Sequence, residues 1–198
     1  MKSHLLFMTI LLTIFLSSLP VAAYEFDQFG AGAYLSFGVP FGWFSNVNLA
    51  ANINAGAHLT YSLERIVPNL VARTTIGYQS FHGDRYGDYK YKFRDLSIYA
   101  HALYFYDLGM PFKPYILAGL GVDFTTVSWD YSGTYHTSGE DTAVGQGITF
   151  GGGITVKTMD LLALFGEANI QTSTWAKGPD FGDIVFNALI GCTFYFYL

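Results

Sequence analysis

The chain has 198 residues, a formal net charge of -5, and a composition that is 51% hydrophobic and 13% charged. No basic cluster indicates nucleic acid as a partner, and the length fits one domain. Cys192 is the only cysteine, which excludes an intrachain disulfide. No run of about 18 apolar residues follows Leu16, so the hydrophobic content is not arranged as membrane-spanning helices.

The first 23 residues have the order of a secretory signal peptide. Lys2 lies in a short polar start, an apolar run covers residues 5 to 16, and Val21-Ala22-Ala23 forms a small-residue cleavage site. We therefore expect residues 1 to 23 to be removed and residues 24 to 198 to be exported as one domain. The residue directly after the cleavage site is Tyr24 and not a cysteine, so we do not expect a lipoprotein anchor.

Four alternating segments occupy the first half of the exported region, at residues 28 to 38, 47 to 61, 70 to 81 and 94 to 106. In each segment every second residue is apolar, and successive strand residues point to opposite faces of a sheet. The apolar sets, which we expect to face outward, are Phe29, Ala31, Ala33, Leu35, Phe37; Leu49, Ala51, Ile53, Ala55, Ala57, Leu59; Leu70, Ala72, Thr74, Ile76, Tyr78; and Leu96, Ile98, Ala100, Ala102, Tyr104.

Four more segments follow at residues 114 to 128, 146 to 157, 161 to 173 and 184 to 197. Each of the eight reaches the roughly 9 to 11 residues that a strand needs to span a membrane. Their outward sets are Ile116, Ala118, Leu120, Val122, Phe124; Ile148, Phe150, Gly152, Ile154, Val156; Leu162, Leu164, Gly166, Ala168, Ile170; and Ile184, Phe186, Ala188, Ile190, Cys192, Phe194, Phe196. None of the residues in these outward sets is charged.

The interleaved, inward positions are mixed, small or polar. A soluble sandwich also alternates, but it would not bury the polar residues found here: Arg73, Asp95, Asp123, Lys157, Glu167, His58, His101, Asn52, Asn54, Gln79, Asn169, Gln171 and Asn187. Because an exported chain without spanning helices can cross a membrane only as a closed barrel, the two faces predict an all-β, eight-stranded, antiparallel, transmembrane up-and-down β-barrel.

The connections between segments differ in length and composition. Those at residues 62 to 69, 107 to 113 and 158 to 160 are short to moderate, whereas those at 39 to 46, 82 to 93, 129 to 145 and 174 to 183 are mostly longer and richer in Gly, Asp, Tyr and Trp. Short periplasmic turns and longer outer loops are typical of outer-membrane barrels. We expect both termini to face the periplasm and the longer loops to face outward.

Two motifs resemble a known family. The sequence Lys113-Pro114-Tyr115-Ile116-Leu117-Ala118-Gly119-Leu120-Gly121 and the closing Thr193-Phe194-Tyr195-Phe196-Tyr197-Leu198 resemble the small outer-membrane β-barrels typified by the membrane domain of outer-membrane protein A and the OmpX/Ail group. The resemblance implies the outer membrane of a Gram-negative-type bacterium, contact with its lipids, and recognition of the aromatic terminus by the barrel-assembly machinery. The chain departs from the pattern in ending on Leu198.

Six inward residues, His58, Arg73, His101, Asp123, Lys157 and Glu167, are predicted to form a polar network in the lumen. Isolated charges in a dry interior are unfavourable, so we expect them to pair. One interpretation is a plug that fastens the barrel, since lumens of this size are filled by side chains. The alternative, which the resemblance to outer-membrane protein A implies, is a narrow gated pore opened by rearrangement of Arg73, Glu167, Lys157 and Asp123.

A lipid-modifying enzyme is a further alternative, because Ser97 and His101 share a strand face and Asp95 lies beside them. We expect no catalysis, since the adjacent His, Ser and Asn signature of a lipid A deacylase is absent and these groups point away from lipid. Cys192 is expected to pack against lipid. No cofactor is indicated.

The predicted outer loops combine aromatic and charged residues. Aromatic side chains can anchor a partner at low entropic cost, so we regard six of them as candidates for binding an extracellular ligand. They are Tyr86, Tyr89, Tyr91, Trp129, Tyr131 and Tyr135. An aromatic belt at the lipid boundary with ordinary solvated loops is the alternative. The acidic and histidine residues of these loops match no metal site, so no metal is predicted. The sequence thus favours a non-enzymatic barrel with a structural or surface-interaction role.

Overall fold

The structure is a computed structural model and describes residues 29–42, 52–83, 89–133, 136–175 and 182–196. The predicted signal peptide lies outside these residues. The strands are β1 (Phe29–Gly42), β2 (Asn52–Ser62), β3 (Leu70–His82), β4 (Tyr89–Phe105), β5 (Phe112–Tyr131), β6 (Thr137–Met159), β7 (Leu162–Trp175) and β8 (Gly182–Phe196). Within this part of the chain, no helix is long and apolar enough to cross a membrane.

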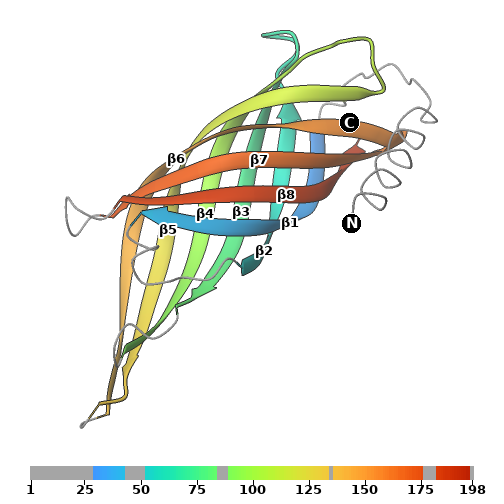
Figure 1. Cartoon of the computed structure of the whole chain (residues 1–198). Helices are drawn as coiled ribbons and strands as arrows, with labels where there is room; N and C mark the ends of the chain where they lie inside the picture. Colours follow the sequence, from blue (N-terminus) through green and yellow to red (C-terminus); the bar gives the residue numbers. More distant parts are fainter. Residues whose placement is uncertain (1–28, 43–51, 84–88, 134–135, 176–181, 197–198) are drawn as a thin grey trace, which may run out of the picture.

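The eight strands form one closed sheet. Each strand pairs antiparallel with the next, and β1 pairs with β8 from Phe29↔Phe196 to Gly42↔Asp183 (Figure 1). Closure gives the edge strands partners, which matters in lipid because an unpaired backbone group there costs several kcal/mol. The predicted fold class is therefore confirmed.

Burial alternates along the strands as the outward sets require. On β3 every second residue from Val71 to Phe81 is buried, and the residues between them are exposed or half-buried. The outward-facing Leu120 and Ile190 are 67% and 68% exposed. Leu49 and Ala51 of the predicted outward set lie outside the described residues.

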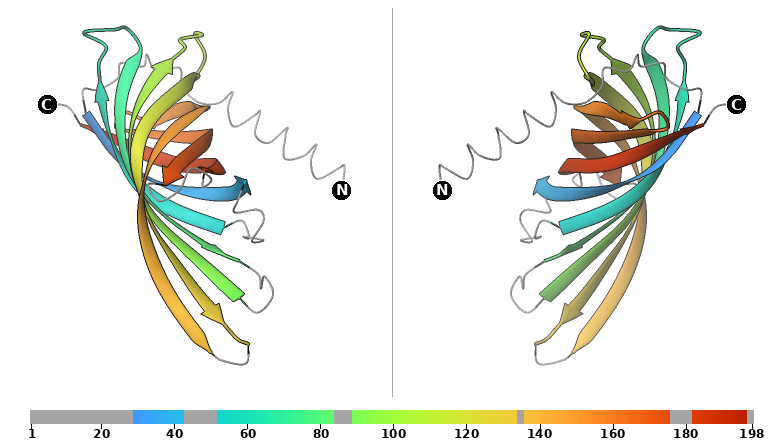
Figure 2. Two further views of the ribbon diagram at one scale, coloured as in Figure 1. Left: turned by 90° about the vertical axis from the view of Figure 1, so that its left-hand side faces the viewer. Right: turned by 90° about the vertical axis from the view of Figure 1, so that its right-hand side faces the viewer.

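Several strand boundaries differ from the prediction. The segment from Trp129 to Gly145 was expected to be a loop, but most of it pairs as a hairpin from Asp123↔Gly145 to Tyr131↔Thr137, and β4 begins at Tyr89 rather than residue 94. On β4 and β5 these residues also alternate, but with aromatic residues such as Phe93 and Trp129 inward and polar residues outward, while the inward residues of β6 are small or polar. A rule that required apolar outward residues therefore ended the strands too early. The β5–β6 hairpin consequently reaches past the other strands at one end of the barrel (Figures 1 and 2).

The opposite end has tight connections. In the β2–β3 turn, Leu63 N donates to Leu70 O over 2.9 Å, and Asn69 adopts a left-handed backbone with φ of 63°. Asparagine tolerates this conformation better than most residues. The β6–β7 connection includes a register shift between Lys157 and Met159.

The apolar core lies inside the lumen, in two separate layers. One layer, at the end with tight connections, comprises Val71, Leu103, Phe105, Tyr115 and Leu117. The other, toward the long hairpins, comprises Phe81, Phe93 and Val185, with Tyr91 and Val127 packed against it. On β3 the predicted Arg73 therefore lies between the two layers, and on β5 so does Asp123.

Candidate functional site

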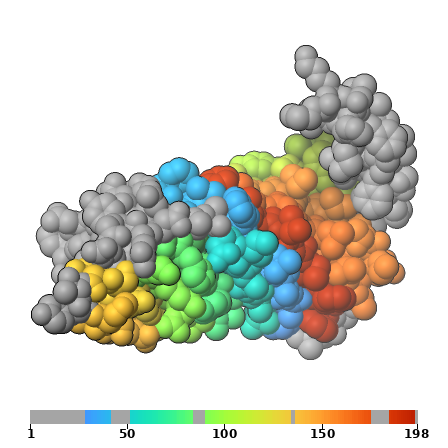
Figure 3. Space-filling view, turned by 60° about the horizontal axis from the view of Figure 1, so that its bottom comes forward, coloured from blue at the N-terminus to red at the C-terminus, as the bar shows by residue number. Residues whose placement is uncertain are grey.

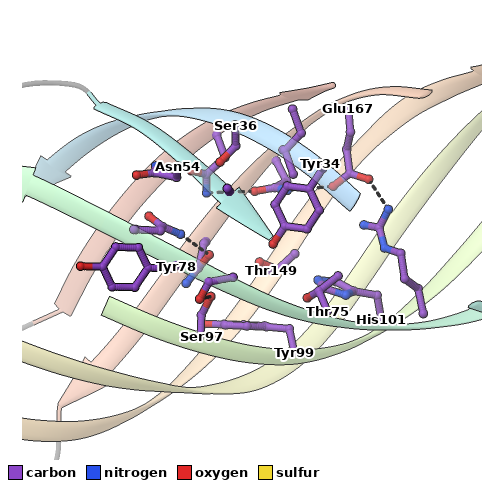
Figure 4. A pocket seen from close by; sticks show the side chains of 18 of the residues that line it. Tyr34, Ser36, Asn54, Thr75, Tyr78, Ser97, Tyr99, His101, Thr149 and Glu167 are labelled. Carbon is purple, nitrogen blue, oxygen red and sulfur yellow. Dashed lines mark hydrogen bonds and ion pairs between the residues drawn. The ribbon is translucent and has the colours of Figure 1, made fainter. Parts of the chain in front are cut away.

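A buried ion pair crosses the centre of the lumen. Arg73 on β3 and Glu167 on β7 come from opposite walls, and their Nη1 and Oε2 atoms are 2.7 Å apart (Figure 4). Tyr115 Oη donates to the same Oε2 over 2.8 Å, and Asn169 Nδ2 donates to Oε1 over 2.9 Å. The side chain of Glu167 is 0% exposed, so both carboxylate oxygens need these donors.

Amides extend this network toward the long hairpins. Asn187 Nδ2 on β8 donates to Asn169 Oδ1 over 3.3 Å, which links β8 through β7 to the ion pair. On the facing wall, Asn54 Oδ1 accepts from Ser80 N over 3.3 Å. The contacts around Glu167 thus join β3, β5, β7 and β8, as expected of a fastening.

Asp123 forms a second polar cluster on the β4–β5 side of the lumen. Its Oδ2 accepts from Tyr99 Oη over 2.7 Å, and its Oδ1 accepts from Gln171 Nε2 over 3.0 Å. The residue is only 2% exposed. Neutral donors rather than Arg73 therefore hold this carboxylate.

The two predicted histidines are buried on either side of Arg73. His58 Nε2 lies 2.9 Å from Thr193 Oγ1, and the ring meets Phe165 edge-on with centroids 5.4 Å apart. His101 pairs in register with Arg73 and stacks on Tyr99 with centroids 5.9 Å apart. The structure thus places both rings in the lumen.

Lys157 does not reach this network. It is half-buried beside the register shift near the end of β6, and no ion pair joins it to another described residue. A buried cation at that end of the lumen is instead Lys113, which the alternating pattern placed in a connection. Lys113 is 5% exposed and its Nζ lies 3.6 Å from Asp107 Oδ2. Its place two residues before Tyr115 was the available signal, because alternate strand residues share a face.

Asp107 lies in the β4–β5 turn outside the spanning strands. The Gly109 N–H donates to its Oδ1 over 3.1 Å, and Lys113 lies beside the other oxygen. The Gly109 N–H and then the Lys113 ammonium lower the pKa of Asp107 below its usual value. This turn is therefore fixed by local contacts.

Two small cavities interrupt the lumen on the two sides of Arg73. One, of about 30 Å³, is lined by Ser36, Asn54, His101 and Glu167 among others, and the second, of about 20 Å³, lies toward Thr193 and Tyr195. Arg73 and Phe165 line both cavities. Each volume suits about one or two water molecules, which is far below the size of a nutrient solute.

The residues considered for catalysis are engaged elsewhere. Ser97 Oγ donates to Gly77 O over 3.4 Å, and Asp95 Oδ1 accepts from Thr125 Oγ1 over 2.6 Å. His101 stacks on Tyr99, and among the described residues no hydrogen bond joins Ser97 to His101. These contacts form no nucleophile and base pair.

The aromatic residues predicted to bind a ligand have different positions. Tyr86 and Tyr135 lie outside the described residues, as does the side chain of Tyr89. The half-buried Tyr91 packs against the outer apolar layer, Trp129 lies over the backbone of Gly139, and Tyr131 curls over Gly133. Tyr91, Trp129 and Tyr131 therefore pack within the hairpins and are also partly exposed on their surface.

The outward face of the same hairpins carries a charged cluster that the sequence analysis did not identify. Arg94 Nη2 lies 2.8 Å from Glu140 Oε2 and 3.1 Å from Ser128 Oγ. Ser128 Oγ also donates to Glu140 over 3.1 Å. The signal was the segment Lys90-Tyr91-Lys92-Phe93-Arg94, in which the cations alternate with aromatics. No group of three potential metal ligands lies together in the part of the chain that the structure describes.

These features define an integral membrane β-barrel with an apolar outer belt and a filled polar lumen. Neisserial surface protein A is a solved structure of similar fold, with a TM-score of 0.52 and 16% identity over 85% of this chain and 97% of that one. Ail, the attachment invasion locus protein of Yersinia pestis, has a TM-score of 0.54 and 10% identity over 86% of this chain and 99% of that one. A major outer membrane protein from Thermus thermophilus has a TM-score of 0.59 and 11% identity over 85% of this chain and 99% of that one.

The sequence itself places the chain in a family. Residues 8–194 match the outer membrane protein beta-barrel domain family, and the chain belongs to it. No curated protein sequence matches the chain. The resemblance drawn from the two motifs is thus confirmed at the level of the family, and outer-membrane lipid is the environment of the apolar belt.

Proposed function

We propose that this protein is a non-enzymatic outer-membrane barrel of a Gram-negative-type bacterium that presents its long hairpins to an extracellular partner. In this proposal the signal peptide is cleaved after Ala23, the termini face the periplasm, and the barrel-assembly machinery reads the aromatic C-terminus. The filled lumen supports a fastening role for the interior, which leaves the hairpins as the surface that is available to interact.

The observation that carries the proposal is the exposed edge of the β5–β6 hairpin. Register pairs of β6 with β5 extend to Thr137, whereas those with β7 begin only at Gly145. Residues 137 to 144 therefore have a neighbouring strand on one side only, within the described residues. An exposed strand edge presents backbone donors and acceptors to which an extended segment of another protein can add as a further strand.

The side chains of this edge favour contact with water. Ser138, Glu140 and Thr142 are all exposed on the outward face. Glu140 is held by Arg94, so the charge at the edge is partly compensated. A partner can then pair through its backbone without burying a bare carboxylate.

The test is to shorten the hairpin while keeping the register of the remaining strands. Replacing residues 129 to 139 by Asn-Gly, a two-residue turn, joins the paired residues Ser128 and Glu140 directly. Binding of cells that display the protein to cultured epithelial cells and to serum proteins is then measured. We expect the shortened protein to fold, as judged by heat-modifiable migration in gels, and to lose binding.

A heparin analogue should be included as a second probe. The Ail protein of Yersinia pestis has been crystallised with the heparin analogue sucrose octasulfate. The likeness to Ail extends only to the fold, so this compound is an independent probe. Unchanged binding to cells, serum proteins and the analogue after the hairpin is shortened would reject the proposal.

A narrow gated pore is the second candidate, and one observation favours it. Arg73 lines the cavities on both sides of the constriction, so release of Glu167 would open a path between them. Lys157 takes no part in this ion pair. Conductance of the purified protein in planar bilayers, compared with that of Arg73→Met, tests the candidate, and absence of conductance in both proteins ends it.

A further inference from the structure

The outward faces of β3 to β6 change from apolar to polar within one step of the strands. Tyr78, Leu96, Phe124 and Val144 are register partners across the four strands, and each is at least 40% exposed. The next row of outward residues is Ser80, Arg94, Thr126 and Thr142, and the row after it is His82, Lys92, Ser128 and Glu140. Lipid contact on this face therefore ends between Leu96 and Arg94.

The cations of these two polar rows lie on one strand, β4, together with Lys90. Arg94, Lys92 and Lys90 follow one another at every second position of β4, which puts all three on the same face. Strands rise about 3.3 Å per residue and are tilted by about 40°, so Arg94 and Lys90 lie roughly 5 and 15 Å above Leu96. This interval begins in the polar headgroup layer that borders the hydrocarbon.

Among the described residues, only one of these three cations, Arg94, forms an ion pair. Glu140 is engaged by Arg94 at 2.8 Å, and Asp130 is the register partner of Lys90. Lys92 instead lies between His82 on β3 and Ser128 on β5, both of which can donate hydrogen bonds. No ion pair joins Lys92 to any other described residue.

The space beside these residues is large enough for a sugar phosphate. A hollow of about 600 Å³ lies along the hairpins. Its lining includes the cations Lys90 and Lys92, and also His82, Ser128, Asp130 and Glu140, of which Glu140 is already paired with Arg94. Binding pockets for small molecules commonly measure about 300 to 1,000 Å³. Figure 3 shows the hairpin at the end of the elongated barrel, continuous with the surface of the neighbouring strands.

From this arrangement we propose that the β4 cation row, Lys90, Lys92 and Arg94, binds the phosphorylated sugar headgroup of a glycolipid in the outer leaflet. The lipid is favoured as the source of the phosphate because the row continues the lipid-facing side of the same strands. The inference rests on the outward orientation of the hairpins in the proposed function. Lys92 is its central residue, and His82 and Ser128 are its register partners on the neighbouring strands.

The test measures enrichment of lipid around the protein. The full mature chain is reconstituted into phosphatidylcholine vesicles that contain bisphosphorylated or monophosphorylated lipid A, extracted in small bilayer discs, and its lipid is quantified by mass spectrometry. We expect lipid A to be enriched over its bulk fraction, and bisphosphorylated lipid A to be enriched more. Each of Lys90→Gln and Lys92→Gln should lower the enrichment by about fivefold.

Two controls separate this interaction from others. Lys157→Gln removes a lysine near the opposite end of the barrel and should leave the enrichment unchanged. Equal enrichment of all variants, or no preference for the second phosphate, would overturn the proposal. If soluble sucrose octasulfate binds through Lys92 while lipid A is not enriched, the row recognises a free polyanion and the glycolipid assignment is wrong.

Orientation is measured separately, by protease cleavage within the β5–β6 hairpin on intact cells. Cleavage without lipid enrichment overturns only the glycolipid inference. Protection of the hairpin in cells whose other surface proteins are cleaved overturns the proposed function as well.

Discussion

The membrane-embedded barrel and its extension at the long hairpins use the same alternation with opposite polarity. Within the barrel, Leu96 points outward and the polar Asp95 points inward. One step further along β4, Arg94 points outward and Phe93 points inward with 1% exposure. The backbone period of two is unchanged across this boundary. What changes is the medium on each side of the sheet, from lipid outside to water outside.

The comparison shows why the interior cannot be read as one continuous polar channel. In the barrel, the apolar side chains contact lipid, so the polar groups enclosed in the lumen must form hydrogen bonds and ion pairs with one another. In the hairpin extension, the polar side chains face water, so apolar side chains pack inside and form the layer of Phe81, Phe93 and Val185. An apolar layer therefore closes the lumen where the surrounding medium changes.

The largest expected effect comes from separating the buried ion pair. Arg73→Met or Glu167→Gln alone should lower the free energy of unfolding by about 3 to 5 kcal/mol, because the remaining charge is left buried without its partner. The double substitution of both residues by Met should cost less than either single change. Urea unfolding of refolded protein in bilayers measures all three. Single variants as stable as the parent would contradict a fastening role.

The polarity of the outer face can be tested by placing the same cation on either side of the boundary. Leu120→Arg should cost about 2 to 4 kcal/mol, since the new charge lies within the lipid belt. Ser138→Arg is on an outward position of the water-exposed hairpin and should change stability by no more than about 0.5 kcal/mol. Similar costs at the two positions would place the lipid boundary elsewhere.

The outer apolar layer gives a smaller effect. Val185→Ala removes two buried carbon groups from contact with Phe81 and Phe93 and should cost about 1.6 kcal/mol. Val67→Ala is the matched change in the β2–β3 turn, where the valine is 40% exposed, and should cost less than about 0.5 kcal/mol. The difference between the two variants in urea midpoint reports whether the layer is packed. Equal midpoints would indicate that it is not.

The smallest effect is expected for the exposed ion pair of the hairpin. Arg94→Gln should lower the free energy of unfolding by only about 0 to 1 kcal/mol, because both side chains reach water. The loss should shrink further as salt is raised, whereas the effect of Arg73→Met should depend little on salt. Measuring both variants at low and high ionic strength compares the two media directly. A salt-independent loss in Arg94→Gln would mean that the pair is shielded from water.

The particular residues show how far prediction from sequence extended. The inward positions of Arg73, Glu167 and Asp123 followed from the alternation alone, but their grouping into two clusters depends on which strands face each other across the lumen. Lys157 shares the inward face and yet lies near the end of its strand, away from Glu167. Lys92 and Arg94 were missed because a rule that fixed one polarity for each face ends the outward set where the medium changes. Lys113 was missed because the predicted strand began one residue after it, at Pro114.

By itself, the sequence determined the fold class and which residues of each spanning strand face lipid. This is because the alternation of apolar and polar residues at every second position is a local property of the chain. The tertiary structure alone decided which inward charges meet, where apolar layers close the lumen, and that β6 extends past β7 with an exposed edge. These features depend on register and on closure of the sheet, which bring together residues from β3 and β7 that no local pattern connects.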